Sequence, residues 1–293
     1  MSTSSYGAPL VRGKEFLAKH EGFALKGRDV ELKSMSNILM RKDASNILLT
    51  GESGVGLTAM TLGLQASKED LGTPMDIISK RFYWLDINDM FASGDPAKIN
   101  SVFENARATL TRNPDSVLVI ENAPDFVNAA RSTGSTHMIN ALMADLRAGK
   151  YQAIMEAPSK NVATVLECDG NFPEFFTTLE IREPKPADLR AIVSHAAATI
   201  EKHHGIKVDP SAVETAVQLT EKYRLQEFRA QPAASITLLD RALSSYRNEA
   251  HRSPPGLVKI DQDIAAVTSV LTGEKKSGPW VGRSELELQG ILS

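Results

Sequence analysis

The chain has 293 residues, of which 42% are hydrophobic, and it carries a formal net charge of −3 with an isoelectric point near 6.1. This length and apolar content suffice for one large domain or two smaller ones, each with its own core. The small net charge gives no overall attraction to nucleic acid or to an anionic membrane, so we expect neither as a partner.

The N-terminus and the cysteine content bear on the compartment. Residues 1–5 read Met-Ser-Thr-Ser-Ser, without the charged start and apolar segment of a secretory signal, and no stretch approaches the length of a membrane span. Cys168 is the single cysteine, which excludes an intramolecular disulfide and fits a reducing compartment. We therefore expect a cytoplasmic protein without direct membrane insertion.

The predicted elements begin after a polar segment at residues 1–20, which we interpret as a tail or docking arm that becomes weakly helical near its end. A helix then opens at Gly27-Arg28-Asp29 with apolar residues on one face. Five apolar strands follow, at 46–50, 82–86, 117–121, 151–156 and 177–181. Helical stripes lie between most of them, the clearest within 99–110 and 138–146. This alternation predicts a parallel sheet covered by helices on both faces.

Helices alone follow Glu183-Pro184-Lys185-Pro186. Apolar helical faces lie within 189–200, 213–220 and 236–246, and a fourth short helix is expected at 261–272. Residues after 272 are rich in Gly, Lys and Glu, with Trp280 as an apolar anchor, which is typical of a tail or partner-binding segment. The predicted domains are an N-terminal tail at 1–20, an α/β domain at 21–183, an all-α domain at 184–272 and a linker-like tail at 273–293.

The most informative motif is a glycine loop between the first of these strands and the helix after it. Its spacing is that of a P-loop, a turn whose backbone N–H groups cradle phosphate. The candidate nucleotide-binding residues are Gly51, Glu52, Ser53, Gly54, Val55, Gly56, Leu57 and Thr58. Leu57 stands where the pattern requires lysine, and losing one charge-assisted hydrogen bond costs roughly 1.5–3 kcal/mol, or about 10- to 100-fold in affinity. Leu57 either packs under a loop that binds nothing, or the loop binds ATP or phosphate weakly.

With these elements placed, the chain resembles the first AAA+ module of Clp-type unfoldases and disaggregases such as ClpB and ClpV. The resemblance covers roughly residues 20–290 and rests on the P-loop together with Gly27-Arg28-Asp29, Glu201-Lys202-His203-His204-Gly205-Ile206-Lys207-Val208, Pro232-Ala233-Ala234-Ser235-Ile236-Thr237-Leu238-Leu239-Asp240 and Thr268-Ser269-Val270-Leu271-Thr272-Gly273. It implies an AAA+ fold, in which a P-loop α/β domain with a parallel sheet is followed by a small all-α lid.

The resemblance also places the family's catalytic positions on this chain. The magnesium and catalytic pair, Asp-Glu in the family, falls on Glu121-Asn122. Glu121 keeps a carboxylate, which serves as a metal ligand or as a polar cap of the pocket, but Asn122 cannot accept a proton from the attacking water. The polar sensor falls within Glu156-Ala157-Pro158, without the usual Thr or Asn. These changes predict that ATP is not hydrolysed efficiently.

Two further family positions act outside the subunit, and neither is kept. The arginines that reach a neighbouring subunit's nucleotide fall near Glu174 and Phe175, and the aromatic pore loop falls on Gly94-Asp95-Pro96-Ala97. Phe172, Phe175 and Phe176 form an apolar cluster at the arginine position. This cluster is either core packing or a hydrophobic surface for a partner.

Taken together, these losses predict a catalytically inactive AAA+ protein, a pseudo-ATPase that acts as a structural or adaptor subunit of a larger protein complex. No cofactor is required, no metal site or catalytic residue is expected, and ATP or ADP with Mg²⁺ binds at most weakly. The alternative is an ATP-binding AAA+ subunit that works with a catalytic partner chain. Other protein subunits, an active AAA+ ATPase among them, are the expected partners, and analogy with Clp-type relatives suggests a bacterial secretion or transfer apparatus as the host.

Overall fold

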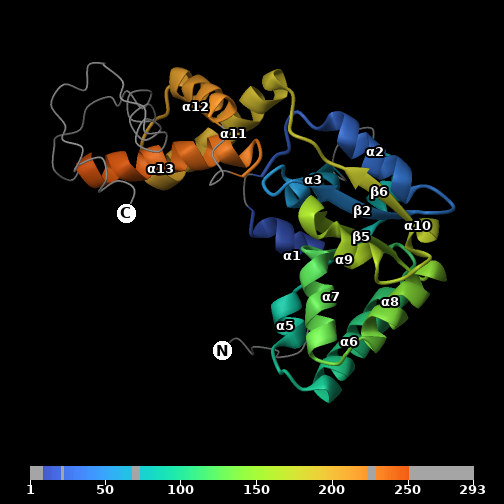
Figure 1. Cartoon of the computed structure of the whole chain (residues 1–293). Helices are drawn as coiled ribbons and strands as arrows, with labels where there is room; N and C mark the ends of the chain where they lie inside the picture. Colours follow the sequence, from blue (N-terminus) through green and yellow to red (C-terminus); the bar gives the residue numbers. More distant parts are fainter. Residues whose placement is uncertain (1–8, 21–22, 68–72, 224–228, 251–293) are drawn as a thin grey trace. The chain divides into compact units, whose positions relative to one another are not determined.

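The computed structural model describes residues 9–20, 23–67, 73–223 and 229–250 (Figure 1). The chain forms two compact units, Met1–Arg182 and Glu183–Ser293. The predicted helix at 261–272 and the predicted tail at 273–293, with Trp280, lie outside the described residues. No helix in the described ranges is long and apolar enough to cross a membrane.

The first unit is built on a six-stranded sheet with the strand order β1-β3-β4-β5-β2-β6. The strands are β1 (Leu10–Arg12), β2 (Asn46–Gly51), β3 (Arg81–Leu85), β4 (Ser116–Ile120), β5 (Gln152–Pro158) and β6 (Phe176–Glu180). Strands β2 to β6 pair in parallel, and β1 pairs antiparallel with β3. Every residue of β2 and of β4 is buried, so both faces of the sheet are covered, because successive side chains of a strand point to opposite faces. The predicted strands and the α/β fold class are confirmed.

The N-terminal segment differs from the prediction of a tail. Leu10 pairs with Leu85 at the edge of the sheet, and α1 (Gly13–Ala18) places the Phe16 ring on Trp84 with 3.9 Å between the ring centroids. The Gln65 side chain donates to the backbone oxygen of Gly13 and accepts from the indole of Trp84. Residues 9–20 therefore belong to the α/β unit, and a three-residue strand carries too little periodicity to be found from sequence.

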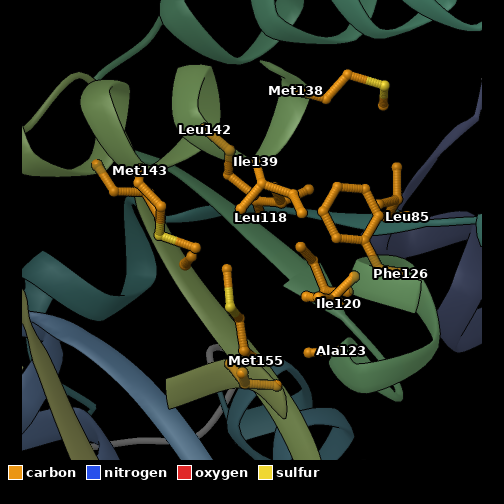
Figure 2. Packing of buried hydrophobic residues seen from close by; sticks show 14 of the residues in the cluster. Leu85, Leu118, Ile120, Ala123, Phe126, Met138, Ile139, Leu142, Met143 and Met155 are labelled. Carbon is orange, nitrogen blue, oxygen red and sulfur yellow. The ribbon is translucent and has the colours of Figure 1, made fainter. Parts of the chain in front are cut away.

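Helices cover the sheet of this unit. They are α2 (Asp29–Leu39), α3 (Leu57–Ala66), α4 (Met75–Ile78), α5 (Ile87–Phe91), α6 (Pro96–Thr111), α7 (Ala123–Ser132), α8 (His137–Arg147), α9 (Val162–Leu166) and α10 (Phe172–Phe175). Figure 2 shows apolar side chains of α7 and α8 meeting those of β3, β4 and β5 in one core cluster. Met155 of β5 faces this cluster, so its neighbour Glu156 faces the opposite side of the sheet.

The aromatic cluster near the end of the sheet is part of the core. Phe172, Phe175 and Phe176 are 0%, 7% and 4% exposed, and the rings of Phe172 and Phe176 stack with 4.1 Å between their centroids. Side chains this buried offer no surface to a partner. Of the two interpretations of these residues, core packing is confirmed and the docking surface is wrong.

The second unit is helical in its described part, as predicted. It contains α11 (Pro186–His204), α12 (Pro210–Lys222) and α13 (Ala233–Ala250), whose apolar faces form a separate core. Asp209 caps α12 by accepting a hydrogen bond from the backbone N–H of Ser211, and Pro210 follows it in the first turn. Within its described residues, three long helices with one shared core make this unit all-α.

Candidate functional site

The glycines of the P-loop are required by the protein's own packing. A Cβ on Gly51 would lie 2.5 Å from the backbone oxygen of Ile181, and 2.8 Å from a methyl group of Val55. Gly56, which immediately precedes α3, has a φ of 96° in the left-handed region, which glycine adopts without strain. The strand-to-helix turn therefore demands both glycines whether or not a phosphate binds there.

The loop's position for a cation is filled by Leu57, the half-buried first residue of α3. Arg28 brings a guanidinium to the same loop and is only 4% exposed. Its Nη2 donates to the backbone oxygen of Val55 at 3.2 Å, and its Nη1 donates to Glu31 at 2.8 Å. Arg28 therefore holds the loop by its backbone, and both of its recorded hydrogen bonds go to the protein itself.

Glu156 of β5 occupies the space below the first turn of α3. It is 3% exposed and lies opposite Leu49 in the parallel pairing of β5 with β2. Thr58 Oγ1 donates to Glu156 Oε2 at 2.8 Å, and Thr61 Oγ1 donates to Glu156 Oε1 at 2.6 Å. Burial raises the pKa of Glu156 to about 7 against these two hydrogen bonds, and the charge of Glu121 raises it further. The P-loop hydroxyl is thus bound by a carboxylate of the protein.

The predicted catalytic pair follows directly after β4. Burial raises the pKa of Glu121, while the neighbouring Thr58 hydroxyl and the charge of His20 lower it. Asn122 is exposed and left-handed, with φ 49° and ψ 57°, and its amide donates to the carboxylate of Asp125. An amide in this position holds the start of α7 and has no basic site for a proton.

Glu121 lies near Thr58, whose hydroxyl lowers its pKa, while Glu52 and Ser53 are exposed on the loop. The sequence reasoning missed the hydrogen bonds of Glu156 and the participation of Thr61. Two signals were available. Thr58 and Thr61 are three residues apart, so they share one helix face, and Glu156 is a lone acid near the end of an apolar strand.

The other family positions are occupied by structural features. Asp95 caps α6 by accepting from the backbone N–H of Ala97, so the segment at the pore-loop position starts a helix.

His204 Nε2 lies 2.8 Å from Asp240 Oδ1, and the described residues contain no group of His, Cys, Asp and Glu suited to a metal ion. Burial raises the pKa of Cys168 to about 11, which disfavours a reactive thiolate.

Both sequence and structure comparisons find known proteins that are similar to this chain. A model of the AAA lid domain matches residues 186–284. The AAA+ fold class with an all-α lid is confirmed. The ATP-binding subunit ClpC of an ATP-dependent Clp protease, from Staphylococcus aureus (strain USA300), is 29% identical over 245 residues, which are 82% of this chain and 29% of ClpC. The chaperone protein ClpB of Helicobacter hepaticus is 28% identical over 243 residues, which are 82% of this chain and 28% of ClpB.

Solved structures of Hsp104 show the same fold. The Saccharomyces cerevisiae Hsp104–ADP complex superposes with a TM-score of 0.78 at 23% identity, covering 92% of this chain and 46% of that one. The closed state of Hsp104 with ATPγS and FITC casein gives a TM-score of 0.77 at 22% identity, covering 90% and 46%. The matches support a Clp-type AAA+ module. The chain spans less than a third of the length of these curated relatives.

Proposed function

We propose that this chain is a pseudo-ATPase, a catalytically inactive AAA+ protein that serves as a structural or adaptor subunit of a larger protein complex. One observation carries the proposal: the loop that would hold phosphate has Leu57 at its cation position. A nucleotide phosphate entering this site would meet no positive charge at the position where active P-loops supply one.

The chain also has no general base at the position that the hydrolysis step requires. Active relatives of this fold need a group that takes a proton from the attacking water, and the resemblance places that group at Asn122. The Asn122 amide is engaged with Asp125 at the start of α7. An amide is not a proton acceptor at neutral pH, so a nucleotide that did bind would persist without turnover.

A scaffold needs only the shape of the module, and the residues around the loop maintain that shape without a ligand. Gly51 and Gly56 are fixed by packing and by backbone conformation, and Arg28 ties the loop to α2. The proposed partners are other protein subunits, including an active AAA+ ATPase, in the cytoplasm. A bacterial secretion or transfer apparatus is proposed as the host by analogy with Clp-type proteins alone.

A second candidate is an ATP-binding subunit whose catalytic groups come from a partner chain. The observation in its favour is that the backbone turn and the start of α3 keep the form of an anion cradle, with Gly54 and Gly56 both in the left-handed region. Glu121 could also serve a metal through the phosphates of a bound nucleotide. This candidate requires that nucleotide stays bound despite Leu57.

Nucleotide content and turnover separate the two candidates. The full chain, purified from its native source without added nucleotide, is denatured, and the released nucleotides are quantified by chromatography. Phosphate release from Mg²⁺-ATP is then followed with the same preparation. The pseudo-ATPase proposal expects nucleotide far below one per chain and no turnover above the rate in buffer. One nucleotide per chain would favour the second candidate, and robust phosphate release by the lone protein would contradict both. Proteins recovered with the native chain would identify the host complex.

A further inference from the structure

We propose that Glu156 is the residue that closes this P-loop to nucleotide phosphates, because its buried carboxylate lies against the first turn of α3, next to the hydroxyl of Thr58, and repels a phosphate in the loop. The inference rests on the proposed function and names the side chain that enforces it. Leu57 removes an attraction for phosphate, whereas Glu156 adds a repulsion.

The sheet fixes the position of Glu156. β5 pairs with β2 residue by residue, Ile154 with Ile47 and Glu156 with Leu49, so Glu156 lies beside the strand that leads directly into the loop. The preceding residues Ile154 and Met155 are 0% and 2% exposed and anchor the strand in the core. With so little freedom, the carboxylate stays below α3 and cannot swing into solvent.

Both carboxylate oxygens are used. Thr58 and Thr61 lie one turn apart on the same face of α3, and each donates its hydroxyl hydrogen to a different oxygen of Glu156. These bonds use only the hydroxyl hydrogens, so they fix the carboxylate next to Thr58 and leave the lone pairs of Thr58 Oγ1 available. The obstacle to nucleotide is therefore the charge of Glu156.

The charge lies beside the N-terminal part of α3. Glu156 accepts hydrogen bonds from the side chains of Thr58 and Thr61, close to the helix end whose dipole would otherwise favour a bound phosphate. At pH 8 this group is ionised, since its pKa is about 7. A phosphate in the loop would share a partly buried region with this charge, and we expect the repulsion to reduce affinity by about tenfold or more.

The position of Glu156 predicts how the loop responds when lysine is restored at residue 57. A lysine introduced by Leu57→Lys would stand next to Thr58, which donates to the Glu156 carboxylate, so we expect this carboxylate to offset the new positive charge. Leu57→Lys alone should therefore leave nucleotide binding weak. Nucleotide binding is restored only if the charge of Glu156 is removed as well.

The experiment compares the affinities of full-chain variants for Mg²⁺-ATP at pH 8, measured with a fluorescent ATP analogue and checked by competition with ATP. The variants are L57K, L57K/E156Q and L57K/E156N. The amide of L57K/E156Q keeps a hydrogen-bonding group at both threonines, and L57K/E156N provides a second neutral side chain if the first double variant does not fold. Melting temperatures establish that each variant is folded.

The matched control is L57K/E180Q. Glu180 lies on β6, opposite Thr50 of β2, at the same end of the sheet, but it is 54% exposed and paired with Arg182. We expect L57K/E156Q to bind at least about tenfold more tightly than L57K, and L57K/E180Q to bind like L57K. Equal affinities of L57K and L57K/E156Q, including the absence of binding by both at millimolar ATP, would overturn the inference.

The wild-type chain is measured in the same series, so that failure of the pseudo-ATPase proposal can be distinguished from failure of the role proposed for Glu156. Tight binding by the wild type would contradict the pseudo-ATPase proposal. In that event Glu156→Gln alone is compared with the wild type. An increase in affinity would still support the role of Glu156, and an unchanged affinity would overturn it.

Discussion

Two buried carboxylates in the α/β unit have opposite surroundings. Asp145, at the end of α8, is 1% exposed and is paired with Arg107 at 2.7 Å and Lys150 at 2.7 Å. Glu156, below the P-loop, is 3% exposed and accepts hydrogen bonds from two threonine hydroxyls, with Glu121 as its charged neighbour. Although burial opposes ionisation of Asp145, hydrogen bonds from Arg107 and Lys150 lower its pKa overall, whereas burial raises the pKa of Glu156 to about 7.

The charge of Asp145 stabilises the fold, whereas the charge of Glu156 does not. Asp145 is ionised and neutralised within the protein, which is how a buried ion contributes to stability. Glu156 has no cation among its recorded partners, so its ionisation costs stability at neutral pH. Groups kept at such a cost are concentrated at functional sites, and this one lies beside the P-loop.

The largest effect is expected from Asp145→Asn. Removing one partner of a buried ion pair leaves the Arg107 guanidinium without its main acceptor, which should lower the free energy of unfolding by about 3 kcal/mol. The measurement is denaturant unfolding at pH 7. Glu104→Gln is the control, because Glu104 bonds the same guanidinium at 2.7 Å from an exposed position and should cost less than about 1 kcal/mol. Equal losses in the two variants would show that Asp145 is not a specially stabilising charge.

How much of the structure the sequence predicts depends on how far apart in the chain the interacting residues are. Strands β2 to β6 and the long helices of both units were predicted because their apolar residues form runs or helical stripes, whereas the short helices α4, α5, α9 and α10 were not predicted. The strand β1 was missed because three residues have no usable period and its pairing partner is β3. The bond from Thr58 to Glu156 joins residues 98 apart in the chain, so the tertiary fold was needed to reveal it.

The next largest effect concerns the pH dependence of stability. The pKa of Glu156 rises from 4.5 to about 7 on folding, so the folded state binds the proton more tightly and stability falls as the pH rises from 4.5 through 7. The change is worth about 3 kcal/mol. Between pH 5 and pH 8, Glu156→Gln should therefore gain about this amount relative to the wild type in denaturant unfolding. A difference between the two proteins that does not vary with pH would contradict the burial of an unpaired carboxylate.

Asp145 provides the opposite slope for comparison. Its folded pKa is lowered, so its contribution is present at neutral pH and is lost as the pH falls through that lowered pKa. The stability difference between Asp145→Asn and the wild type should therefore be constant from pH 5 to pH 8. If it instead followed the curve of Glu156→Gln, the contrast between the two carboxylates would be wrong.

The smallest effect is expected from the hydroxyl of Thr61, which is fully buried and donates to Glu156. Thr61→Val keeps the shape and removes the donor, which should destabilise the protein by about 1 kcal/mol at pH 8. Thr111→Val is the control, because Thr111 is exposed and donates only to carbonyl oxygens of its own helix. A loss at Thr61 no larger than at Thr111 would mean that this hydrogen bond contributes nothing measurable.

The central claim is that the P-loop persists as a folding element without serving as a nucleotide site. Isothermal titration of the wild-type full chain with Mg²⁺-ATP tests it most directly, because the result depends on no variant. We expect no heat of binding, or a dissociation constant far weaker than micromolar. A dissociation constant tighter than micromolar would contradict it.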